Sequence, residues 1–333
     1  MKASVIANAN IALVKYWGKR NKELMLPQTG SVSMTTEALQ AHTTVEFDPK
    51  YTEDILIVGG KEYRKGDEEY DDYVSLFLNV VRKMTGNQTK CKIVSNNNFP
   101  TAAGLASSAA GFAALAAAVN AALEMGLDGR QLTMLARRGS GSATRSIQGG
   151  FVEWHRGEAE DGSDCFAEQI FPPEHWPEFR MVIAVTSKKD KKVKSRAGMA
   201  KSVENSPFYE SWRELVPKHI DMVKKALADR DFKTLGETAE LNALAMHAVA
   251  IATNPPIVYW NAGTMDIVHA VMDWRDEGLE CYSTIDGGPQ VKILCLEKDA
   301  NDIANRLKQF GNIEDVIITK PGQAARVVDE HLF

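Results

Sequence analysis

The segment 284-TIDGGPQVK-292 carries an acidic side chain, Asp286, where a predicted strand enters a glycine-rich turn. A carboxylate here could act on a substrate, and the neighbouring glycines would let a substrate approach the backbone closely. Asp, Gly and Pro are also the ordinary residues of turns, so the pattern alone favours a turn-forming role for Asp286. The residues by themselves leave both roles open.

Two other segments combine cations with aromatic or hydroxyl side chains, as a site for an anion requires. In 11-IALVKYWGKR-20, the cations Lys15, Lys19 and Arg20 follow an apolar stretch, which favours an anionic ligand over a packed core. In 137-RRGSGSATRSIQGGFVEW-154, Arg145 could pair with a carboxylate or phosphate while serine hydroxyls bind the remaining oxygens. The alternative for both segments is a solvated surface, the commoner position of lysine and arginine.

The stretch 98-NFPTAAGLASSAAG-111 joins a loop rich in Gly and Ala to an Ala-rich helical pattern. Ser107 and Ser108 stand where the unpaired N–H groups and the dipole of a helix N-terminus would bind a phosphate. The sequence lacks both GxxxxGK[ST] and GxGxxG, the patterns of the commonest nucleotide-binding loops. A serine N-cap on a buried packing helix explains the stretch equally well.

Composition narrows the class of protein. The formal net charge of −5 gives no reason to expect a nucleic-acid partner. No charged residue occurs from Ile93 to Leu123, which is long enough for a membrane helix. Asparagines, serines and a shortage of Leu, Ile, Phe and Val would make this stretch insert poorly, so we predict a buried helix and no membrane partner.

The cysteines and the N-terminus favour a cytoplasmic protein. Cys91, Cys165, Cys281 and Cys295 lie far apart without a CxxC pair, which fits neither a zinc site nor a disulfide framework. We therefore assign no metal ligand from the sequence. The N-terminal apolar stretch precedes its basic cluster, the reverse of the order in a signal peptide.

Strand and helix patterns are mixed throughout, which favours an α+β protein. Strands are predicted at 43–47, in a hairpin at 55–63 turning at Gly59-Gly60, at 179–187, around 281–296 and near 315–319. Helices are predicted at about 70–85, 106–125, 128–138, 202–228, 231–250, 262–277 and 298–310. The basic stretch 188-KKDKKVKSR-196 is predicted to separate two domains, 1–186 and 187–333. Because of its charge repulsion, we expect this stretch to be mobile without a ligand.

Taken together, the segments resemble the diphosphomevalonate decarboxylase family of the GHMP kinase superfamily. The resemblance rests on NIALVKYWGKR, LPQTGSVSMT, NNFPTAAGLASSAAGFA, ARRGSGSATRSIQGGFVEW and DGGPQVK, in this order, and runs from about residue 5 to residue 295. It implies the GHMP kinase fold, with an N-terminal domain like ribosomal protein S5 domain 2, a ferredoxin-like C-terminal domain and the active site between them. It also implies that ATP and Mg²⁺ are used to convert mevalonate 5-diphosphate into isopentenyl diphosphate, ADP, phosphate and CO₂. A homodimer is implied as well.

The resemblance also implies roles for particular residues. Asp286 corresponds to the aspartate that orients or deprotonates the C3 hydroxyl of the substrate, and Lys15 to a lysine beside it. Arg145 is implied to be catalytic and to bind substrate. Substrate-binding positions correspond further to Tyr16, Lys19, Ser140 and Ser142. ATP-binding positions correspond to Pro100, Thr101, Ala102, Ala103, Gly104, Leu105, Ala106, Ser107, Ser108 and Ser195.

The sequence departs from the family pattern at three positions near these residues. Lys194 stands where many bacterial members have serine, and we expect its side chain in solvent. The turn reads DGGPQ where DAGPN is usual, so Gly287 replaces an alanine and Gln290 an asparagine. We expect these two changes to affect the fit of the substrate and not the reaction. Other activities to be weighed are decarboxylation of 5-phosphomevalonate to isopentenyl phosphate, a 3-kinase without decarboxylation, and a catalytically inactive ligand-binding relative.

Overall fold

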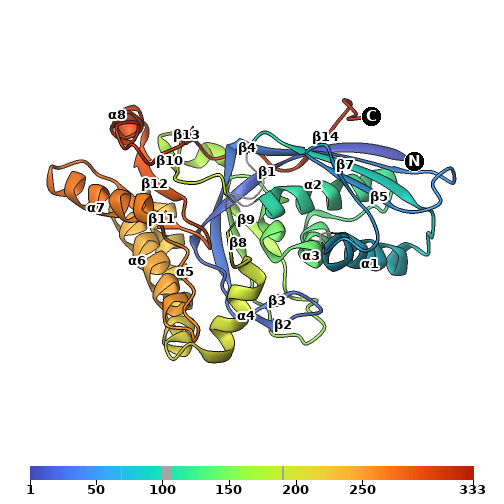
Figure 1. Ribbon diagram of the computed structural model, residues 1–333, viewed down its shortest axis with the longest axis horizontal. Coiled ribbons are helices and arrows are strands. Elements are labelled where there is room, and N and C mark those ends of the chain that lie inside the picture. The colour runs from blue at the N-terminus through green and yellow to red at the C-terminus, as the bar shows by residue number, and fades with distance from the viewer. Residues whose placement is uncertain (69, 100–106, 190) are drawn as a thin grey trace.

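Two sheets flanked by helices form the frame of the molecule in the computed structural model (Figure 1). The structure describes residues 1–68, 70–99, 107–189 and 191–333. The first sheet has the strand order β14-β1-β4-β7-β5-β6, with β8 pairing β4 and β9 pairing β8. Its strands are β1 (Lys2–Val14), β4 (Ser31–Phe47), β5 (Ile55–Val58), β6 (Lys61–Tyr63), β7 (Cys91–Asn97), β8 (Phe151–Trp154), β9 (Ala167–Phe171) and β14 (Arg326–Val328).

The second sheet is antiparallel and has the strand order β11-β12-β10-β13. Its strands are β10 (Phe179–Val185), β11 (Tyr282–Ile285), β12 (Val291–Leu296) and β13 (Asp315–Thr319). Along the chain, the order of elements is strand, helices, two strands, helix and strand. A small ribbon of β2 (Lys19–Asn21) and β3 (Leu26–Pro27) pairs separately from both sheets.

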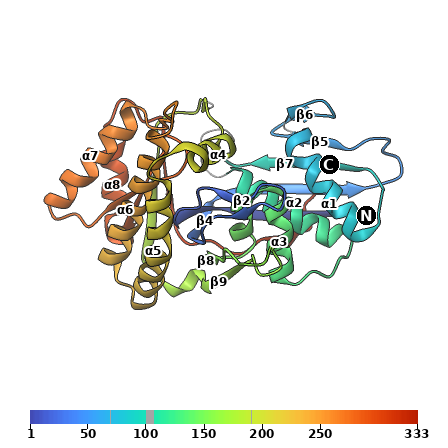
Figure 2. The same ribbon diagram turned by 90° about the horizontal axis from the view of Figure 1, so that it is seen from below.

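The helices gather into two groups with one helix between them (Figure 2). The first group contains η1 (Tyr70–Ser75), α1 (Leu76–Thr85), α2 (Ser107–Ala122) and α3 (Gly129–Gly139). The second group contains α5 (Tyr209–Asp229), α6 (Phe232–Ile251), α7 (Ala262–Asp276) and α8 (Glu297–Leu307). Between them lies α4 (Ser195–Asn205), and the described residues also form the short helices η2 (Gly141–Ser146) and η3 (Pro173–His175).

Helix α2 lies directly against the long strands β1 and β4. Its alanines are buried on nearly every side, and small side chains allow the backbone to approach a sheet closely. The packing of its neighbour α3 depends on Gly139, where an added methyl group would collide with the ring of Phe112. These contacts fix the N-terminus of α2 relative to η2, which follows α3 in the chain.

The second sheet has separate cores on its two faces because its side chains alternate. Val291 and Ile293 of β12 join one core with α7 and α8, while Leu294 joins the larger core shared with the first sheet. Lys292 lies on the same strand and is fully buried. A charged side chain in an otherwise apolar run therefore has to find its partner inside the protein.

Most of the predicted elements are confirmed, including the hairpin at 55–63. Both Gly59 and Gly60 have positive φ, 56° and 82°, as a two-residue hairpin turn requires. The predicted helix over 202–228 is wrong: α4 begins at Ser195, and a break at 206–208 separates it from α5. Pro207 lies in this break, where it can neither donate the next backbone hydrogen bond nor fit against the preceding turn.

The predicted division between 1–186 and 187–333 stays a prediction, but the strand pairing bears on it. β10 precedes residue 186 and pairs with β12 and β13, while β14 follows it and pairs with β1. The chain therefore crosses between the sheets twice. Among the described helices, none has both the length and the apolar character needed to cross a membrane.

Candidate active site

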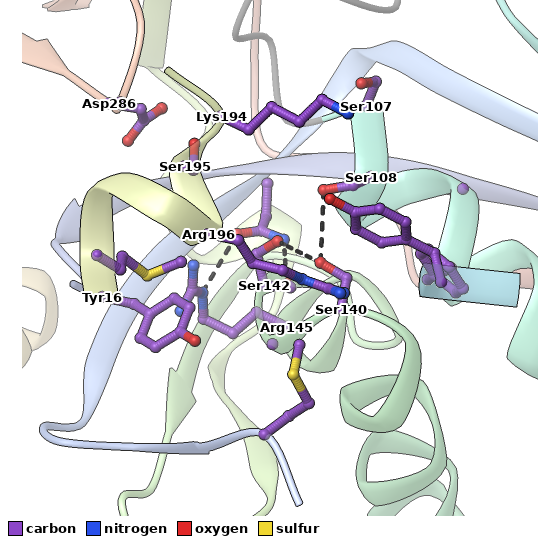
Figure 3. A pocket seen from close by; sticks show the side chains of 18 of the residues that line it. Tyr16, Ser107, Ser108, Ser140, Ser142, Arg145, Lys194, Ser195, Arg196 and Asp286 are labelled. Carbon is purple, nitrogen blue, oxygen red and sulfur yellow. Dashed lines mark hydrogen bonds between the residues drawn. The ribbon is translucent and has the colours of Figure 1, made fainter. Parts of the chain in front are cut away.

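A pocket of about 660 Å³ lies where the two sheets and α4 meet. Its walls come from the end of β1, from η2, from the first turns of α2 and α4, and from the turn between β11 and β12. Figure 3 shows Asp286 and Ser195 on one side and Ser108, Ser140 and Arg145 on another. Residues more than a hundred positions apart in the sequence thus share one cavity.

Asp286 follows β11 and has an ammonium group against each carboxylate oxygen. Lys15 Nζ is 2.8 Å from Oδ1, and Lys292 Nζ is 3.2 Å from Oδ2. Burial alone would raise the pKa of the Asp286 carboxyl, but the two lysines outweigh it and hold the pKa well below its usual range. About a quarter of the side chain, 24%, remains exposed to the pocket, so the ionised carboxylate can meet a ligand.

Lys15 is held at the end of β1 by its own hydrogen bonds. Its ammonium group also donates to the Ala12 carbonyl at 2.8 Å, and its backbone N–H donates to Asn242 Oδ1 at 2.7 Å. Burial lowers the pKa of Lys15 to about 8, although Asp286 opposes this change. The ammonium group therefore predominates at neutral pH and titrates just above it.

His247 of α6 supports the turn that carries Asp286. Its Nε2 lies 3.1 Å from the Asp286 carbonyl oxygen, and its ring packs against the Trp260 ring with centroids 4.9 Å apart. Burial, followed by the charge of Lys15, lowers the pKa of His247 to about 3. The imidazole is therefore neutral and donates Nε2–H to the carbonyl.

Arg145 extends from η2 into the pocket and is 3% exposed. Its Nε donates to Asn10 Oδ1 at 3.2 Å, and its Nη1 donates to Ser31 Oγ. Burial lowers the pKa of Arg145 to about 10, so it stays cationic at neutral pH. Both partners are neutral, which leaves the positive charge available for an anion.

The serines beside Arg145 form a chain of hydroxyls. Ser108 Oγ lies 3.4 Å from Ser140 Oγ, which in turn lies 3.2 Å from Ser142 Oγ (Figure 3). Asn10 fixes this region by donating to the Ser142 carbonyl at 2.9 Å. A phosphate bound here could accept from hydroxyls of both α2 and η2.

Tyr16 and Lys19 complete the cationic end of the pocket. The buried hydroxyl oxygen of Tyr16 has no hydrogen-bond partner within the described part of the chain. A buried hydroxyl usually has a partner, so a bound anion would supply one. Burial, with a contribution from Arg196, lowers the pKa of Lys19 to about 8.

Within the described residues, α2 spans Ser107–Ala122, inside the predicted helix 106–125, and its first turn lines the pocket. Ser107 and Ser108 both line the cavity. The predicted phosphate-binding positions from Pro100 to Ala106 lie outside the described residues. Their role in binding ATP therefore stays a prediction. The two roles considered for this stretch, a buried packing helix and a phosphate-binding segment, are compatible. The helix packs on the sheet along its length, and its first turn lines the pocket.

The first turn of α4 closes the other side of the pocket. Ser195 Oγ accepts from Lys191 Nζ at 2.7 Å, and the same ammonium group donates to the Gly287 carbonyl at 2.7 Å. Arg196 lies over the Tyr73 ring, 3.9 Å from its centroid, and donates to the Gly139 carbonyl at 3.0 Å. These contacts join the start of α4 to the turn between β11 and β12 and to the first group of helices.

Lys194 differs from the expectation that its side chain lies in solvent. The side chain is half-exposed, but it lines the pocket and points toward Ser107 at the start of α2 (Figure 3). Its ammonium group is 2.7 Å from Glu68 Oε1. The extra cation of this chain therefore lies at the edge of the pocket.

The far end of the pocket is apolar and aromatic. It lies between β5, β7, η1 and α2, and it is lined by Leu56, Val58, Tyr63, Tyr73, Ile93 and Phe112. No sequence pattern predicted this wall, because its residues are ordinary buried or half-buried side chains that come from several separate strands and helices. A flat, weakly charged ring system fits such a wall, while phosphates fit the cationic end.

The structure brings together every predicted site residue that lies among the described ones: Lys15, Tyr16, Lys19, Ser107, Ser108, Ser140, Ser142, Arg145, Ser195 and Asp286. From the sequence we assigned no role to Asn10, Lys191 or Lys292. Lys191 is one cation in a run of cations, so its type could not single it out. Lys292 did carry a signal, because a lone lysine inside a buried strand needs a charged partner.

The departures at Gly287 and Gln290 have different consequences. Gly287 lines the pocket, whereas Gln290 is fully buried outside it. Gln290 Oε1 accepts from the Thr186 N–H at 2.6 Å, and its Nε2 donates to the Ser187 carbonyl at 2.5 Å. Gln290 therefore ties the turn to the end of β10 and does not touch the ligand space.

One group of potential metal ligands lies away from this pocket. Glu153, His155 and Glu168 have ligand atoms within 4.8 Å of one another. Lys224 Nζ is 2.5 Å from Glu153 Oε2, so an ammonium group already balances the buried acid. Among the described residues lining the active-site pocket, Asp286 is the single carboxylate.

Comparison with known proteins gives a consistent result over nearly the whole chain. Residues 7–167 match the model of the diphosphomevalonate decarboxylase-like N-terminal domain, and residues 181–329 match that of the mevalonate 5-diphosphate decarboxylase C-terminal domain. The diphosphomevalonate decarboxylase of Candida albicans is 39% identical over 327 residues, which cover 93% of this chain and 89% of that protein.

Solved structures are similar over the same extent. A structure described as MDDEF in complex with MVAPP, AMPPCP and magnesium has a TM-score of 0.92 and 39% identity, covering 99% of each chain. The mevalonate diphosphate decarboxylase of Staphylococcus aureus has a TM-score of 0.91 and 37% identity, covering 98% of each chain.

Proposed function

The chain belongs to the diphosphomevalonate decarboxylase family, and from this premise we infer how its residues act on mevalonate 5-diphosphate. The reaction is an ATP-dependent decarboxylation that gives isopentenyl diphosphate, ADP, phosphate and CO₂. The observation that carries the assignment of roles is the ionised Asp286, which is open to the pocket and held between Lys15 and Lys292.

The substrate binds at the cationic end of the pocket. Among the described residues, no salt bridge joins Arg145 or Lys19 to an acid, and the Tyr16 hydroxyl has no hydrogen-bond partner. These groups can therefore bind the diphosphate and carboxylate of the substrate. Ser140 and Ser142 add hydroxyl donors from the same segment. This placement directs the C3 hydroxyl toward Asp286, since that carboxylate lies on the opposite side of the pocket from Ser140 (Figure 3).

ATP binds with its phosphates at the N-terminus of α2 and its adenine at the apolar end. Ser107 and Ser108 stand at the positive end of the α2 dipole, where backbone N–H groups bind phosphate oxygens. Lys191, just before α4, and Ser195, the first residue of α4, approach from the other side, so the γ-phosphate lies between them and the C3 hydroxyl. The aromatic side chains of Tyr63, Tyr73 and Phe112 suit the adenine ring.

The donor set also fits Mg²⁺, which prefers oxygen ligands and often keeps phosphates and water among them. Asp286 is already bound by lysines, so the hydroxyls of Ser107 and Ser108 and the ATP phosphates would hold the ion. Mg²⁺ would supply charge neutralisation for the transferring phosphoryl group.

Asp286 acts mainly by orienting the C3 hydroxyl. A carboxylate whose pKa is held low is a weak base, so it accepts a hydrogen bond and takes the proton only as phosphoryl transfer makes the oxygen acidic. The C3–O bond then breaks, and its electron pair leaves with the phosphate. The electrons of the C–CO₂ bond form the alkene, and Lys15 and Arg145 stabilise the charges that develop.

Two finer points of architecture belong to the same proposal. The order of strands and helices around β10 to β13 supports a ferredoxin-like C-terminal domain, and the first sheet with α2 supports a domain like ribosomal protein S5 domain 2. We expect a cytoplasmic homodimer. The four free, buried cysteines agree with a reducing compartment.

The function is tested with purified protein, Mg-ATP and either mevalonate 5-diphosphate or its 5-monophosphate, with ADP and CO₂ measured in the same samples. We expect equal amounts of ADP and CO₂ with the diphosphate. ADP without CO₂ would identify a kinase, and a faster reaction with the monophosphate would assign the other substrate. Neither product with either substrate would refute the enzymatic function.

Asp286→Asn tests the role of the carboxylate. We expect kcat to fall by about 10³-fold or more, since the amide cannot accept the proton or balance the two ammonium groups. ATP affinity, measured by fluorescence titration, should change little, because ATP binds at α2 and α4. Asp302→Asn on the exposed face of α8 is the control, and an Asp286→Asn variant with full turnover would return Asp286 to a turn-forming role.

A further inference from the structure

Lys292 is a buried cation to which the mechanism above gives no role of its own. Its side chain is 0% exposed, and its Nζ lies 3.2 Å from Asp286 Oδ2 and 3.3 Å from the Gln290 carbonyl oxygen. Lys15 holds the other oxygen, Oδ1, at 2.8 Å. Each oxygen of the carboxylate therefore has its own ammonium partner, one at the end of β1 and one on β12.

This second ammonium group adds positive charge to a cluster that already has a surplus. Arg145 and Lys191 lie near the same carboxylate, and nearby like charges disfavour one another. Burial is the main reason that the pKa values of Lys15 and Lys191 are lowered to about 8, and the charge of Lys292 lowers both further. An uncharged side chain of the same length would fill the space at position 292 equally well, so packing does not explain the charge.

We propose that Lys292 is a positioning residue for the decarboxylation: its ammonium group holds Oδ2 of Asp286, so that the carboxylate keeps one orientation toward the C3 hydroxyl. This inference rests on the proposed function. The last torsion of an aspartate side chain is broad, so a carboxylate with one partner can rotate. Without Lys292, Lys15 can bridge both oxygens and turn the plane of the carboxylate away from the substrate.

The groups that face this cluster come from every element packed around it. They are Lys15 after β1, Arg145 on η2, Lys191 before α4, His247 on α6 and Lys292 itself on β12. His247 is neutral and Arg145 is cationic throughout the neutral range. The basic limb of kcat/KM therefore follows Lys15 and Lys191, whose pKa values lie near 8.

The test is Lys292→Met, which keeps an unbranched side chain of similar length but removes the charge. We expect kcat with mevalonate 5-diphosphate to fall by about 10- to 100-fold, the usual cost of a misplaced catalytic group. KM for ATP should stay within about twofold, because the substitution leaves the interactions that bind ATP in the ground state unchanged. Lys298→Met, on an exposed lysine at the start of α8, is the matched control and should behave as the wild type.

The pH profile separates positioning from a merely structural role. Activity requires protonated Lys15, so it is full below about pH 8 and lost as pH rises through that value. Removing the repelling charge of Lys292 raises the pKa of Lys15, so the basic limb of kcat/KM moves to higher pH although kcat is lower. A structural role would instead lower the melting temperature and leave the limb in place.

Stability provides the third readout. Removing one partner of a buried ion pair is destabilising where it leaves the other charge uncompensated, but Asp286 keeps Lys15 when Lys292 is replaced. The melting temperature of ligand-free Lys292→Met should therefore stay close to that of the wild type. If this variant does not fold, Lys292→Gln keeps a hydrogen-bond donor without the charge and should show the same shift of the limb.

Unchanged kcat with an unmoved basic limb, in a wild-type enzyme that releases ADP and CO₂ equally, would overturn the inference alone. Failure of the wild-type enzyme to release CO₂ would instead overturn the proposed function.

Discussion

At the scale of single residues, Arg145 is a buried cation whose hydrogen-bond partners are neutral. Asn10 and Ser31 hold its Nε and Nη1, and these contacts fix the guanidinium without neutralising it. Burying an unpaired charge is unfavourable, so such an arrangement persists where a ligand supplies the opposite charge. The planar guanidinium can then bind two oxygens of a carboxylate or phosphate at once.

Arg145→Lys keeps the charge but loses this geometry. We expect KM for mevalonate 5-diphosphate to rise by about tenfold or more and kcat to fall, because a single ammonium group replaces a bidentate donor. Steady-state kinetics with saturating ATP measures both constants. Arg130→Lys, at an arginine exposed over the Phe166 ring, is the control. Equal KM values for wild type and Arg145→Lys would exclude Arg145 from the substrate site.

Residue types in the sequence identified the candidates, but they could not decide between roles. Asp286 follows the pattern of a turn, and it also forms the turn, since Gly288 N–H donates to the Asp286 carbonyl at 2.6 Å. What distinguishes it is contact with Lys15, which lies 271 positions away in the sequence. No local pattern encodes that distance, so only the resemblance to a family connected the two residues.

At the scale of elements, the turn from β11 to β12 adapts to its neighbours through Gly287. A β-carbon built at Gly287 would lie 3.0 Å from the Trp17 ring and 3.1 Å from Ser195 Oγ. Trp17 cannot move easily, because its Nε1 donates to Ser202 Oγ at 2.8 Å and its carbonyl accepts from the Tyr209 hydroxyl at 2.8 Å. Gly287 therefore permits the close approach of α4 and Trp17 to the turn.

Gly287→Ala tests this close packing. Reduced freedom of the unfolded chain would stabilise the variant by about 0.4–1 kcal/mol, while overpacking costs about 1–3 kcal/mol. The second effect is larger, so we expect the free energy of unfolding in urea to fall by about 1 kcal/mol. Displacement of Ser195 should also raise KM for ATP. A more stable variant with unchanged KM would show that α4 can move away from the added methyl group without loss of stability.

The element boundaries near α4 were the least predictable part of the fold. The helical pattern over 202–228 merged α4 with α5, because periodicity continues across the break. The basic run before α4 was expected to be a loop, yet Ser195 and Arg196 already belong to the helix. Contacts with Gly139 and Tyr73 favour this helical start, and those contacts are tertiary.

At the scale of the whole molecule, the site lies where the chain passes between two sheets. Strand patterns predicted β10 and the strands after it, but they did not predict that β10 pairs with β12 or that β14 returns to β1. Pairing between distant strands depends on packing across the whole core. The sequence therefore supported the α+β class and the candidate residues, while the geometry of the pocket required the structure.

The assembled pocket concentrates cations, and this predicts how ligands affect stability. Lys15, Lys292, Lys191 and Arg145 surround one carboxylate, so the ligand-free protein contains repulsion that a polyanion relieves. A ligand at 100 times its Kd stabilises the native state by about 2.7 kcal/mol, which corresponds to roughly 4 °C in a protein of 333 residues. Mevalonate 5-diphosphate should therefore raise the melting temperature measured by calorimetry, whereas unphosphorylated mevalonate should not. In Arg145→Lys the shift should shrink at the same concentration, and an equal shift from both compounds would mean that the cation cluster does not bind the diphosphate.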